Sequence, residues 1–330
     1  MIRARGPAAR AAGLLLAASL LLAASLLPVA SARAEPAREA VVTVQLGNAV
    51  EVVDLATRTV ARRIPVDGAP AGIALSPDRR RAYVTRPEGH GLAVIDLDAG
   101  RVTAEVPLPG GPLGIAADPR GGTVYVADWY GTRLFVLVER DGALALDGEI
   151  AVGASPSGIA VSPDGATLYV ANREADTVSV VDARARRETA VIPVGQHPFG
   201  ITLDPAAGRA YTANVTGDDV SVIDLTTARE IGRVPTGRRP YVVALAAGRG
   251  FVTNQYANSV TAFDLATLKP LAEIEVGDHP EGIAADPETG RLYVADWGDN
   301  ALTVIDARTL KTVSEIPVGN GPRAFGDFLR

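Results

Sequence analysis

The sequence predicts an all-β fold, a seven-bladed β-propeller with four-stranded antiparallel blades. A proline recurs at intervals of 42, 44, 42, 42, 40 and 42 residues, and similar residues follow it each time. Each repeat holds four short β-rich segments, and the two chain ends hold complementary parts of a further repeat. Repeats of about 40 residues with four strands are typical of propeller blades around a central channel. The recurring residues are Pro70, Pro112, Pro156, Pro198, Pro240, Pro280 and Pro322.

The copy that begins at Pro156 shows how one repeat makes four strands. Its segments GIAVSP, LYVAN, TVSVVD and TAVIPVG are apolar or alternating, and polar or turn-forming residues separate them. We name these strands A to D, with A nearest the channel. A glycine follows the repeated proline by two residues in five copies, as crowding near the axis would require. These glycines are Gly72, Gly114, Gly158, Gly200 and Gly282.

The two ends of the chain together predict a seventh blade. The N-terminal segments VVTVQ, AVEVVDL and ARRIPV supply strands B, C and D, and the C-terminal segment GPRAFGDFL supplies strand A. Joining them closes the ring and removes its free edges. We therefore expect residues 35–330 to form a single propeller domain.

The first 34 residues have the pattern of a Sec-type signal peptide. Three arginines precede an apolar run over residues 11–27, and Ala32 and Ala34 form an A-x-A cleavage pattern. We predict cleavage after Ala34 and no stable membrane insertion of the mature chain, with a retained membrane anchor as the alternative. The sequence has no cysteine, which excludes disulfides and a lipoprotein anchor. Export without cysteine favours the periplasm, with secretion as the alternative.

Charge disfavours nucleic acid as a general partner. Residues 35–330 hold 28 basic and 38 acidic residues, so the mature chain carries a net charge of −10. Phosphate backbones repel such a surface on average.

Several segments resemble the YVTN-type β-propeller repeats of bacterial exported proteins. They are AYVTR at residues 82–86, LYVAN at 168–172, FVTNQYANSV at 251–260, SVID at 221–224 and IPVG at 192–195 and 316–319. The resemblance covers almost all of residues 40–330. It implies the propeller fold and leaves the activity open, because members include surface and periplasmic proteins of unassigned role. Lactonase-type propellers and amine dehydrogenase heavy subunits are more distant relatives in architecture.

Residues that recur in register are interpreted as scaffold. One strand-B position holds an aromatic residue in six copies, which predicts packing between blades. The last strand-B residue is Asn or Asp in five copies, which predicts turn capping, with a ring of cation ligands as the alternative. Val138 replaces an Asp that the other copies carry after strand C, which predicts an altered C–D turn. The aromatic position is Tyr83, Tyr125, Tyr169, Tyr211, Phe251 and Tyr293, and the polar one is Asp128, Asn172, Asn214, Asn254 and Asp296.

Residues without a register explanation predict the binding site. We place all eight remaining Tyr, Trp and His residues in B–C loops or D–A connections, which emerge on one face of a propeller, where loops on a rigid scaffold commonly bind ligands. His197, Arg239 and His279 occupy the same position before the strand-A proline, so we expect an arc suited to an anionic ligand or an acidic partner loop, with three solvated loop residues as the alternative. One residue deeper, past the proline, we expect Phe199, Tyr241, Glu281 and Arg323. The predicted ligand-binding set is His90, Trp129, Tyr130, His197, Phe199, Arg239, Tyr241, Tyr256, His279, Glu281, Trp297 and Arg323.

The sequence favours a non-catalytic recognition protein. No H-E-x-x-H, G-x-S-x-G or P-loop motif occurs, and without cysteine there is no covalent c-type haem. We predict no catalytic residues, no cofactor and no metal site, and a monomer that binds a small ligand or a protein partner. One alternative is a lactonase-like hydrolase using Glu281, His279 and Arg239. The other is a subunit or accessory of a periplasmic oxidoreductase.

Overall fold

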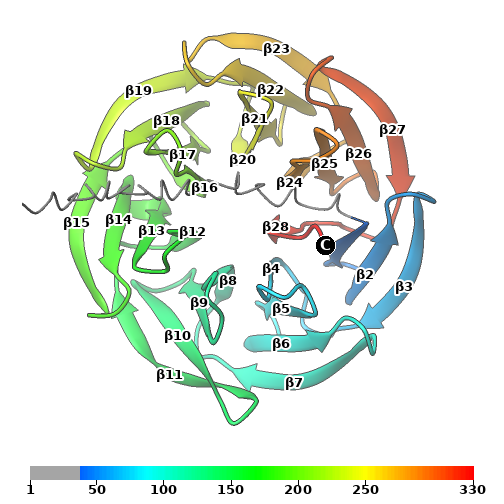
Figure 1. Ribbon diagram of the computed structural model, residues 1–330, viewed down its shortest axis with the longest axis vertical. Helices are drawn as coiled ribbons and strands as arrows, with labels where there is room; N and C mark the ends of the chain where they lie inside the picture. The colour runs from blue at the N-terminus through cyan, green and yellow to red at the C-terminus, as the bar shows by residue number, and fades with distance from the viewer. Residues whose placement is uncertain (1–37) are drawn as a thin grey trace, which may run out of the picture. The chain divides into compact units, whose positions relative to one another are not determined.

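The computed structural model describes residues 38–330, which form seven β-sheet blades around one axis (Figure 1). This confirms the predicted seven-bladed propeller. The predicted signal peptide, residues 1–34, lies outside the described residues. Within residues 38–330 the only helical element is the single turn η1 (Arg173–Ala175), and no helix there is long and apolar enough to cross a membrane.

Six blades each contain four consecutive antiparallel strands in sequence order, and the sheet of blade 1 gains β28 (Phe325–Gly326) as a fifth strand. Blade 1 is β4 (Gly72–Leu75), β5 (Arg81–Arg86), β6 (Gly91–Asp96) and β7 (Arg101–Pro107). Blade 2 is β8 (Pro112–Ala117), β9 (Thr123–Asp128), β10 (Arg133–Arg140) and β11 (Ala143–Ala151). Blade 3 is β12 (Pro156–Val161), β13 (Thr167–Asn172), β14 (Thr177–Asp182) and β15 (Arg187–Pro193).

The second half of the ring repeats this order. Blade 4 is β16 (Pro198–Asp204), β17 (Arg209–Asn214), β18 (Asp219–Asp224) and β19 (Arg229–Pro235). Blade 5 is β20 (Pro240–Ala246), β21 (Arg249–Asn254), β22 (Ser259–Asp264) and β23 (Pro270–Glu275). Blade 6 is β24 (Pro280–Asp286), β25 (Arg291–Asp296), β26 (Ala301–Asp306) and β27 (Lys311–Pro317).

Blade 7 is built from both chain ends, as predicted. The N-terminal strands β1 (Glu39–Val44), β2 (Ala49–Asp54) and β3 (Thr59–Pro65) form an antiparallel sheet. The C-terminal segment joins β1 through two antiparallel bridges, Val44 with Pro322 and Ala40 with Leu329.

The C-terminal segment is too long for a regular strand A. Between the two bridges, β1 advances by four residues and the C-terminal segment by seven. The excess forms β28 (Phe325–Gly326), which pairs in parallel with β4 of blade 1 rather than with β1. Figure 1 shows β28 near the centre of the ring. The closure of the ring therefore sends a short bulge, with Phe325, toward the channel.

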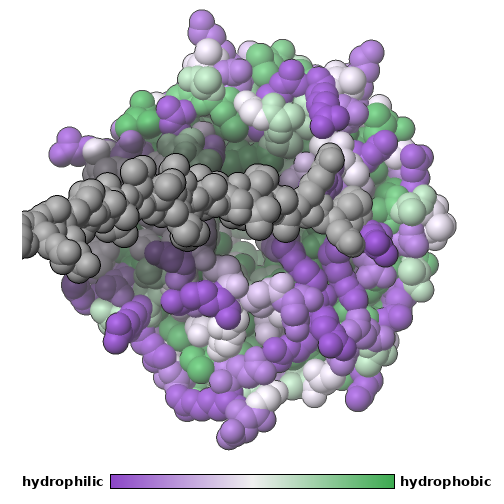
Figure 2. All heavy atoms as spheres, viewed as in Figure 1, coloured by the Kyte–Doolittle hydropathy of each residue, from purple (hydrophilic) through white to green (hydrophobic). Residues whose placement is uncertain are grey.

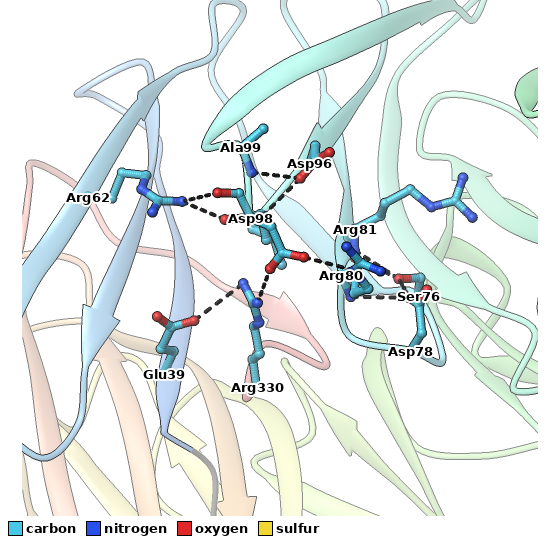
Figure 3. Close-up of polar contacts among 11 residues, drawn as sticks. Glu39, Arg62, Ser76, Asp78, Arg80, Arg81, Asp96, Asp98, Ala99 and Arg330 are labelled. Atoms are coloured by element: carbon cyan, nitrogen blue, oxygen red, sulfur yellow. Dashed lines mark hydrogen bonds and ion pairs between the residues drawn. The ribbon is translucent and has the colours of Figure 1, made fainter.

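Ion pairs tie the two chain ends to blade 1 on the face of the A–B and C–D turns (Figure 3). The Arg330 guanidinium contacts the carboxylates of Glu39, 3.4 Å away, and Asp98, 2.5 Å away. Arg80 contacts the same Asp98 at 2.8 Å, and Arg62 donates to the Leu97 carbonyl at 2.5 Å. These pairs are largely exposed, so they fix the position of the chain ends more than they add to stability.

Figure 2 shows hydrophilic side chains over much of the rim on the face in view, with apolar side chains between them. The apolar core lies between adjacent blades. Each strand-B aromatic residue is at most 8% exposed, which confirms its predicted packing role. Tyr83, for example, packs with residues of blades 1 and 2, and Tyr211 with residues of blades 4 and 5.

Strand A is crowded at its start, as the repeated glycines predict. A Cβ on Gly114 would lie 1.5 Å from the Ser157 carbonyl oxygen of the next blade, and one on Gly72 would lie 2.3 Å from the Leu113 oxygen. Hydroxyl groups also link successive blades at this level. Thr43 Oγ1 donates to the Ala71 oxygen at 2.7 Å. Similar bonds join Thr85 to Leu113, Ser157 to Phe199, Thr202 to Val243 and Thr253 to Glu281.

The C–D turns follow the sequence pattern. Asp54, Asp264 and Asp306 each accept hydrogen bonds from two backbone N–H groups of the turn, and these bonds lower the pKa of each carboxyl. Blade 2, which carries Val138 here, turns instead through Asp141 and Gly142, both with positive φ, between two longer strands. Two positive φ values are typical of a type I′ hairpin. The altered turn is confirmed.

The polar residues that end strand B bond differently from the prediction. Asn172 Nδ2 donates to the hydroxyls of Thr177 and Ser179, at 3.1 and 2.8 Å. Asn254 makes the equivalent bonds to Ser259 and Thr261. The prediction that these Asn side chains cap the turn by bonding its backbone is therefore wrong. Their buried amides donate to side-chain hydroxyls of strand C instead. These bonds fasten strand B to strand C.

We expect Gly114→Ala to destabilise the fold by about 1–3 kcal/mol or more, because its Cβ would overlap a backbone oxygen of blade 3. Gly232→Ala is the matched control, since its Cβ would meet only a Leu268 methyl carbon at 3.3 Å. Chemical denaturation of both variants measures the difference. Equal stabilities would contradict the crowded axis.

We expect Asp296→Asn to stabilise the protein above neutral pH. Burial raises the pKa of Asp296 to about 7, against hydrogen bonds from Thr303 that lower it. The folded state therefore holds a proton that the unfolded state releases near pH 4, and stability falls as pH rises from about 4 to 7. The variant should gain up to about 4 kcal/mol at pH 8 and little at pH 4.

The converse substitution, Asn254→Asp, places a carboxyl in the same buried position of blade 5. It should lose stability over the same pH range in which Asp296→Asn gains it. Stability curves of both variants between pH 4 and 8 provide the measurement. A gain for Asp296→Asn that does not change with pH would show that burial of this carboxyl is not the cause.

Candidate functional site

Hydrogen bonds between loops join the B–C loops and D–A connections into one face. Asp176, in the B–C loop of blade 3, accepts from the His197 backbone N–H at 2.8 Å. Asp218, in the B–C loop of blade 4, accepts from the Arg239 N–H at 2.8 Å. Each bond links the B–C loop of one blade to the connection that enters the next blade. We call this surface the loop face.

The residue before the strand-A proline adopts a left-handed backbone conformation in several blades. His197, Arg239 and His279 have φ values of 53°, 56° and 52°, and Ser155 has 50°. Histidine tolerates this region better than most residues. The turn therefore places the three predicted side chains in equivalent positions at the start of blades 4, 5 and 6.

Two of these three side chains share a row of stacked groups. The Arg239 guanidinium lies 5.2 Å from the centre of the Tyr256 ring. The His279 ring lies 5.6 Å from Tyr256 and 6.3 Å from Trp297, edge to face in both cases. We call Arg239, Tyr256, His279 and Trp297 the rim row. It spans the loop face over blades 5 and 6.

His197 has a different set of contacts. Its Nε2 lies 3.8 Å from Glu174 Oε2, and Glu174 also contacts Arg173. The Arg173 guanidinium lies 5.3 Å from the centre of the Trp129 ring. The contacts of His197 thus lead toward Trp129, whereas those of Arg239 and His279 meet at Tyr256.

A cavity of about 320 Å³ opens on the loop face, and we call it the mouth pocket. Five of the predicted residues line it, namely Trp129, Tyr130, Phe199, Tyr241 and Arg323. The remaining lining residues are Gln45, Pro87, Glu88, Gly111, Leu113 and Phe325.

Three rings close the mouth pocket toward the channel. The Phe199 ring centre lies 4.7 Å from that of Tyr241 and 5.1 Å from that of Phe325, and Tyr241 stacks on Phe325 at 6.3 Å. We call these three residues the aromatic plug. Trp129 meets its edge, 5.9 Å from Phe199. The predicted position one residue past the proline therefore reaches the axis in blades 4 and 5.

The other two residues predicted at that depth form a buried ion pair. Arg323 donates to both carboxylate oxygens of Glu281, at 2.7 and 3.1 Å, and Gln255 Nε2 donates to Oε1 at 2.7 Å. Glu281 is 1% exposed. Burial raises the pKa of Glu281, while Arg323 and Gln255 act to lower it. Three donated hydrogen bonds fit the carboxylate form and occupy the oxygens that a general base would need free.

The guanidinium groups at and beside the mouth pocket are paired, and the exposed Glu88 adds a carboxylate to its lining. Arg323 is neutralised by Glu281, and Arg173 is paired with Glu174. Burial raises the pKa of the Tyr241 hydroxyl, so this residue stays neutral at ordinary pH. The pocket therefore offers aromatic faces, a neutral hydroxyl, a partnered guanidinium and the exposed carboxylate of Glu88.

Two predicted residues, His90 and Tyr130, are largely exposed. His90 is exposed at a turn position that Asn48 and Asp176 occupy in other blades, and its Nδ1 lies 3.2 Å from the Gly110 oxygen. Tyr130 is 83% exposed and covers Gly111, so that it stands at the edge of the mouth pocket.

Sequence reasoning missed Phe325 and Gln255. Phe325 occupies the strand-A position that holds Ile or Val in blades 1 to 6, so comparison of the repeats could have singled it out. Gln255 follows the last strand-B residue, the position of Trp129 and Trp297, and could have been found in the same way. Among residues 38–330, no group of His, Asp or Glu is arranged to hold a metal ion.

Comparison with known proteins finds proteins of similar fold. A family model described as lactonase, 7-bladed beta-propeller matches residues 143–243, from the last strand of blade 2 to blade 5. A comparison with curated proteins finds no match.

Three solved structures illustrate the likeness. Hydrazine synthase of Kuenenia stuttgartiensis has a TM-score of 0.72 and 19% identity, over 85% of this chain and 98% of that one. The dihydro-heme d1 dehydrogenase NirN in complex with DHE has a TM-score of 0.66 and 20% identity, over 88% and 75%. A functionally unknown protein from Desulfotomaculum acetoxidans has 0.73 and 15%, over 88% and 100%. At these identities the likeness shows the fold alone.

We expect Arg323→Ala to cost about 3–5 kcal/mol at neutral pH, because it leaves the Glu281 carboxylate buried without its partner. The double variant Glu281→Gln with Arg323→Leu should recover most of that loss, since no buried charge remains. Chemical denaturation of wild type, single and double variants gives the comparison. A double variant as unstable as the single one would mean that packing, not charge, holds this corner.

Proposed function

We propose that this protein recognises a planar aromatic ligand in the mouth pocket and does not transform it. The observation that carries the proposal is the lining of that pocket by Trp129, Tyr130, Phe199, Tyr241 and Phe325. Aromatic faces bind planar groups by stacking, and a pocket of this volume lies at the lower end of the range for small-molecule sites.

The charge pattern supports stacking over ion pairing as the source of affinity. An anionic ligand would need a free guanidinium, but Arg323 and Arg173 each have a carboxylate partner. The ligand that fits best is not anionic and has an aromatic body with one polar edge, which Gln45, Glu88 and the Tyr241 hydroxyl can bind. The aromatic side chain of a partner loop is the alternative occupant, and the exposed Tyr130 supports it.

Trp129 makes occupation of the pocket measurable. The protein has two tryptophans, so Trp297→Phe leaves Trp129 as the only indole fluorophore. Titration of this variant with indole-3-carboxamide, naphthalene-2-carboxamide and riboflavin should give saturable quenching for at least one probe. Tyr241→Ala in the same background should weaken that binding about tenfold or more.

The matched control is Trp129→Phe, which leaves Trp297, a residue of the rim row, as the only tryptophan. Its fluorescence should stay nearly constant over the same titration. The proposal is contradicted if no probe quenches Trp129 saturably, or if Trp297 is quenched with the same affinity.

A hydrolase is the second candidate, and the lactonase family match over residues 143–243 is the observation that favours it. That segment includes His197 and Arg239, whereas Glu281 lies outside it and is bonded to Arg323 and Gln255. Hydrolysis of dihydrocoumarin, followed by absorbance, tests this function. Turnover that is lost in His197→Ala would favour the hydrolase over the recognition protein.

A role beside an oxidoreductase is the third candidate. Two structural neighbours are named as a hydrazine synthase and a dihydro-heme d1 dehydrogenase, and these names are the reason for considering this candidate.

We also propose that the chain belongs to the YVTN-type repeat proteins and, from the signal sequence pattern, that it is located in the periplasm. Fractionation of the producing cell tests the location directly.

A further inference from the structure

A second cavity lies in the channel on the other side of the aromatic plug. Its volume is about 570 Å³, and strand A of six blades and the C-terminal segment line it. Phe199 and Phe325 belong to the lining of both cavities, so the plug stands between them. We call this space the channel cavity.

A ring of small residues borders the space. The fourth residue after each strand-A proline is Ala or Thr in six blades, and Gly326 holds the same position in the seventh. These six residues are Ala74, Ala116, Ala160, Thr202, Ala244 and Ala284. Ala160 and Ala284 are only partly buried, so a larger side chain at either position would occupy part of the cavity.

The hydroxyl groups in the lining are engaged within the protein. Ser157 Oγ lies within hydrogen-bonding distance of three backbone oxygens, including that of Phe199 at 3.0 Å, and Thr202 Oγ1 donates to the Val243 oxygen at 2.6 Å. Asp327, the carboxylate in the lining, contacts Arg79 at 2.5 Å. The side chains therefore offer a ligand mostly apolar contacts, and the free edges of the strands A add backbone N–H and C=O groups.

We propose that the channel cavity binds an uncharged, mostly apolar small molecule, independently of the mouth pocket. An apolar cavity of about 150 Å³ holds benzene, so a space nearly four times larger accommodates a molecule of two or three rings or a folded hydrocarbon chain. The plug separates this ligand from one in the mouth pocket, and the site extends toward the A–B turns, where Asp327 lies.

The probe that tests this proposal is N-phenyl-1-naphthylamine, which is uncharged and fluoresces strongly in apolar surroundings. Wild type should bind one equivalent. Ala160→Leu with Ala284→Leu, placed on blades 3 and 6 at opposite sides of the ring, should weaken binding at least tenfold. The matched control is Ala99→Leu with Ala185→Leu, which adds the same side chains at exposed C–D turn positions and should bind like wild type.

The site of binding separates this proposal from binding at the mouth. Trp129→Ala should leave the affinity for N-phenyl-1-naphthylamine within about twofold of wild type. Loss of binding in Trp129→Ala, with normal binding in the doubly filled variant, would overturn the proposal. Absence of binding by wild type would do the same.

A crystal of wild type soaked in 1-iodonaphthalene keeps the test valid if the filled variant does not fold. Iodine density beside Ala160 and Ala284 supports the channel cavity as the site. Iodine density confined to the mouth pocket or to surface positions overturns it.

Discussion

Crowding of the seven strand-A starts around one axis is the constraint on which the rest of the structure depends. A Cβ placed on Gly114 would lie only 1.5 Å from a backbone oxygen of the next blade, and hydroxyls such as Thr253 Oγ1 bond directly to the neighbouring strand A. Adjacent blades are thereby held at fixed spacing. Loops that leave such a frame keep their positions, and this is why aromatic side chains from separate blades can form one pocket.

The C-terminal bulge distinguishes this protein from a regular propeller, because it supplies residues to the site. The C-terminal segment has three more residues than β1 between their two bridges, and it brings Phe325 against Phe199 and Tyr241. The same segment carries Arg323, which neutralises Glu281. Ring closure and site construction are therefore carried out by the same few residues.

The fold was predictable because the seven copies of the repeat within one sequence can be compared with one another. Pro156 and its equivalents set the period, and the complementary chain ends set the blade count. The pocket was predictable only in part. Trp129 and Tyr241 stand out as exceptions among the copies, whereas the inward course of β28 depends on a mismatch in length between two distant segments. The histidines were placed correctly in the loops, but side-chain partners such as Glu174 and Tyr256 depend on rotamers that spacing does not reveal.

The coupling between the Phe199 and Phe325 rings tests the aromatic plug most directly. A double-mutant cycle with Phe199→Ala and Phe325→Ala compares the free energies of unfolding of the two single variants and the double variant. Rings in edge contact at 5.1 Å should give a coupling of about 0.5–1.5 kcal/mol. Strictly additive losses would show that the rings do not meet and that the two cavities are one channel.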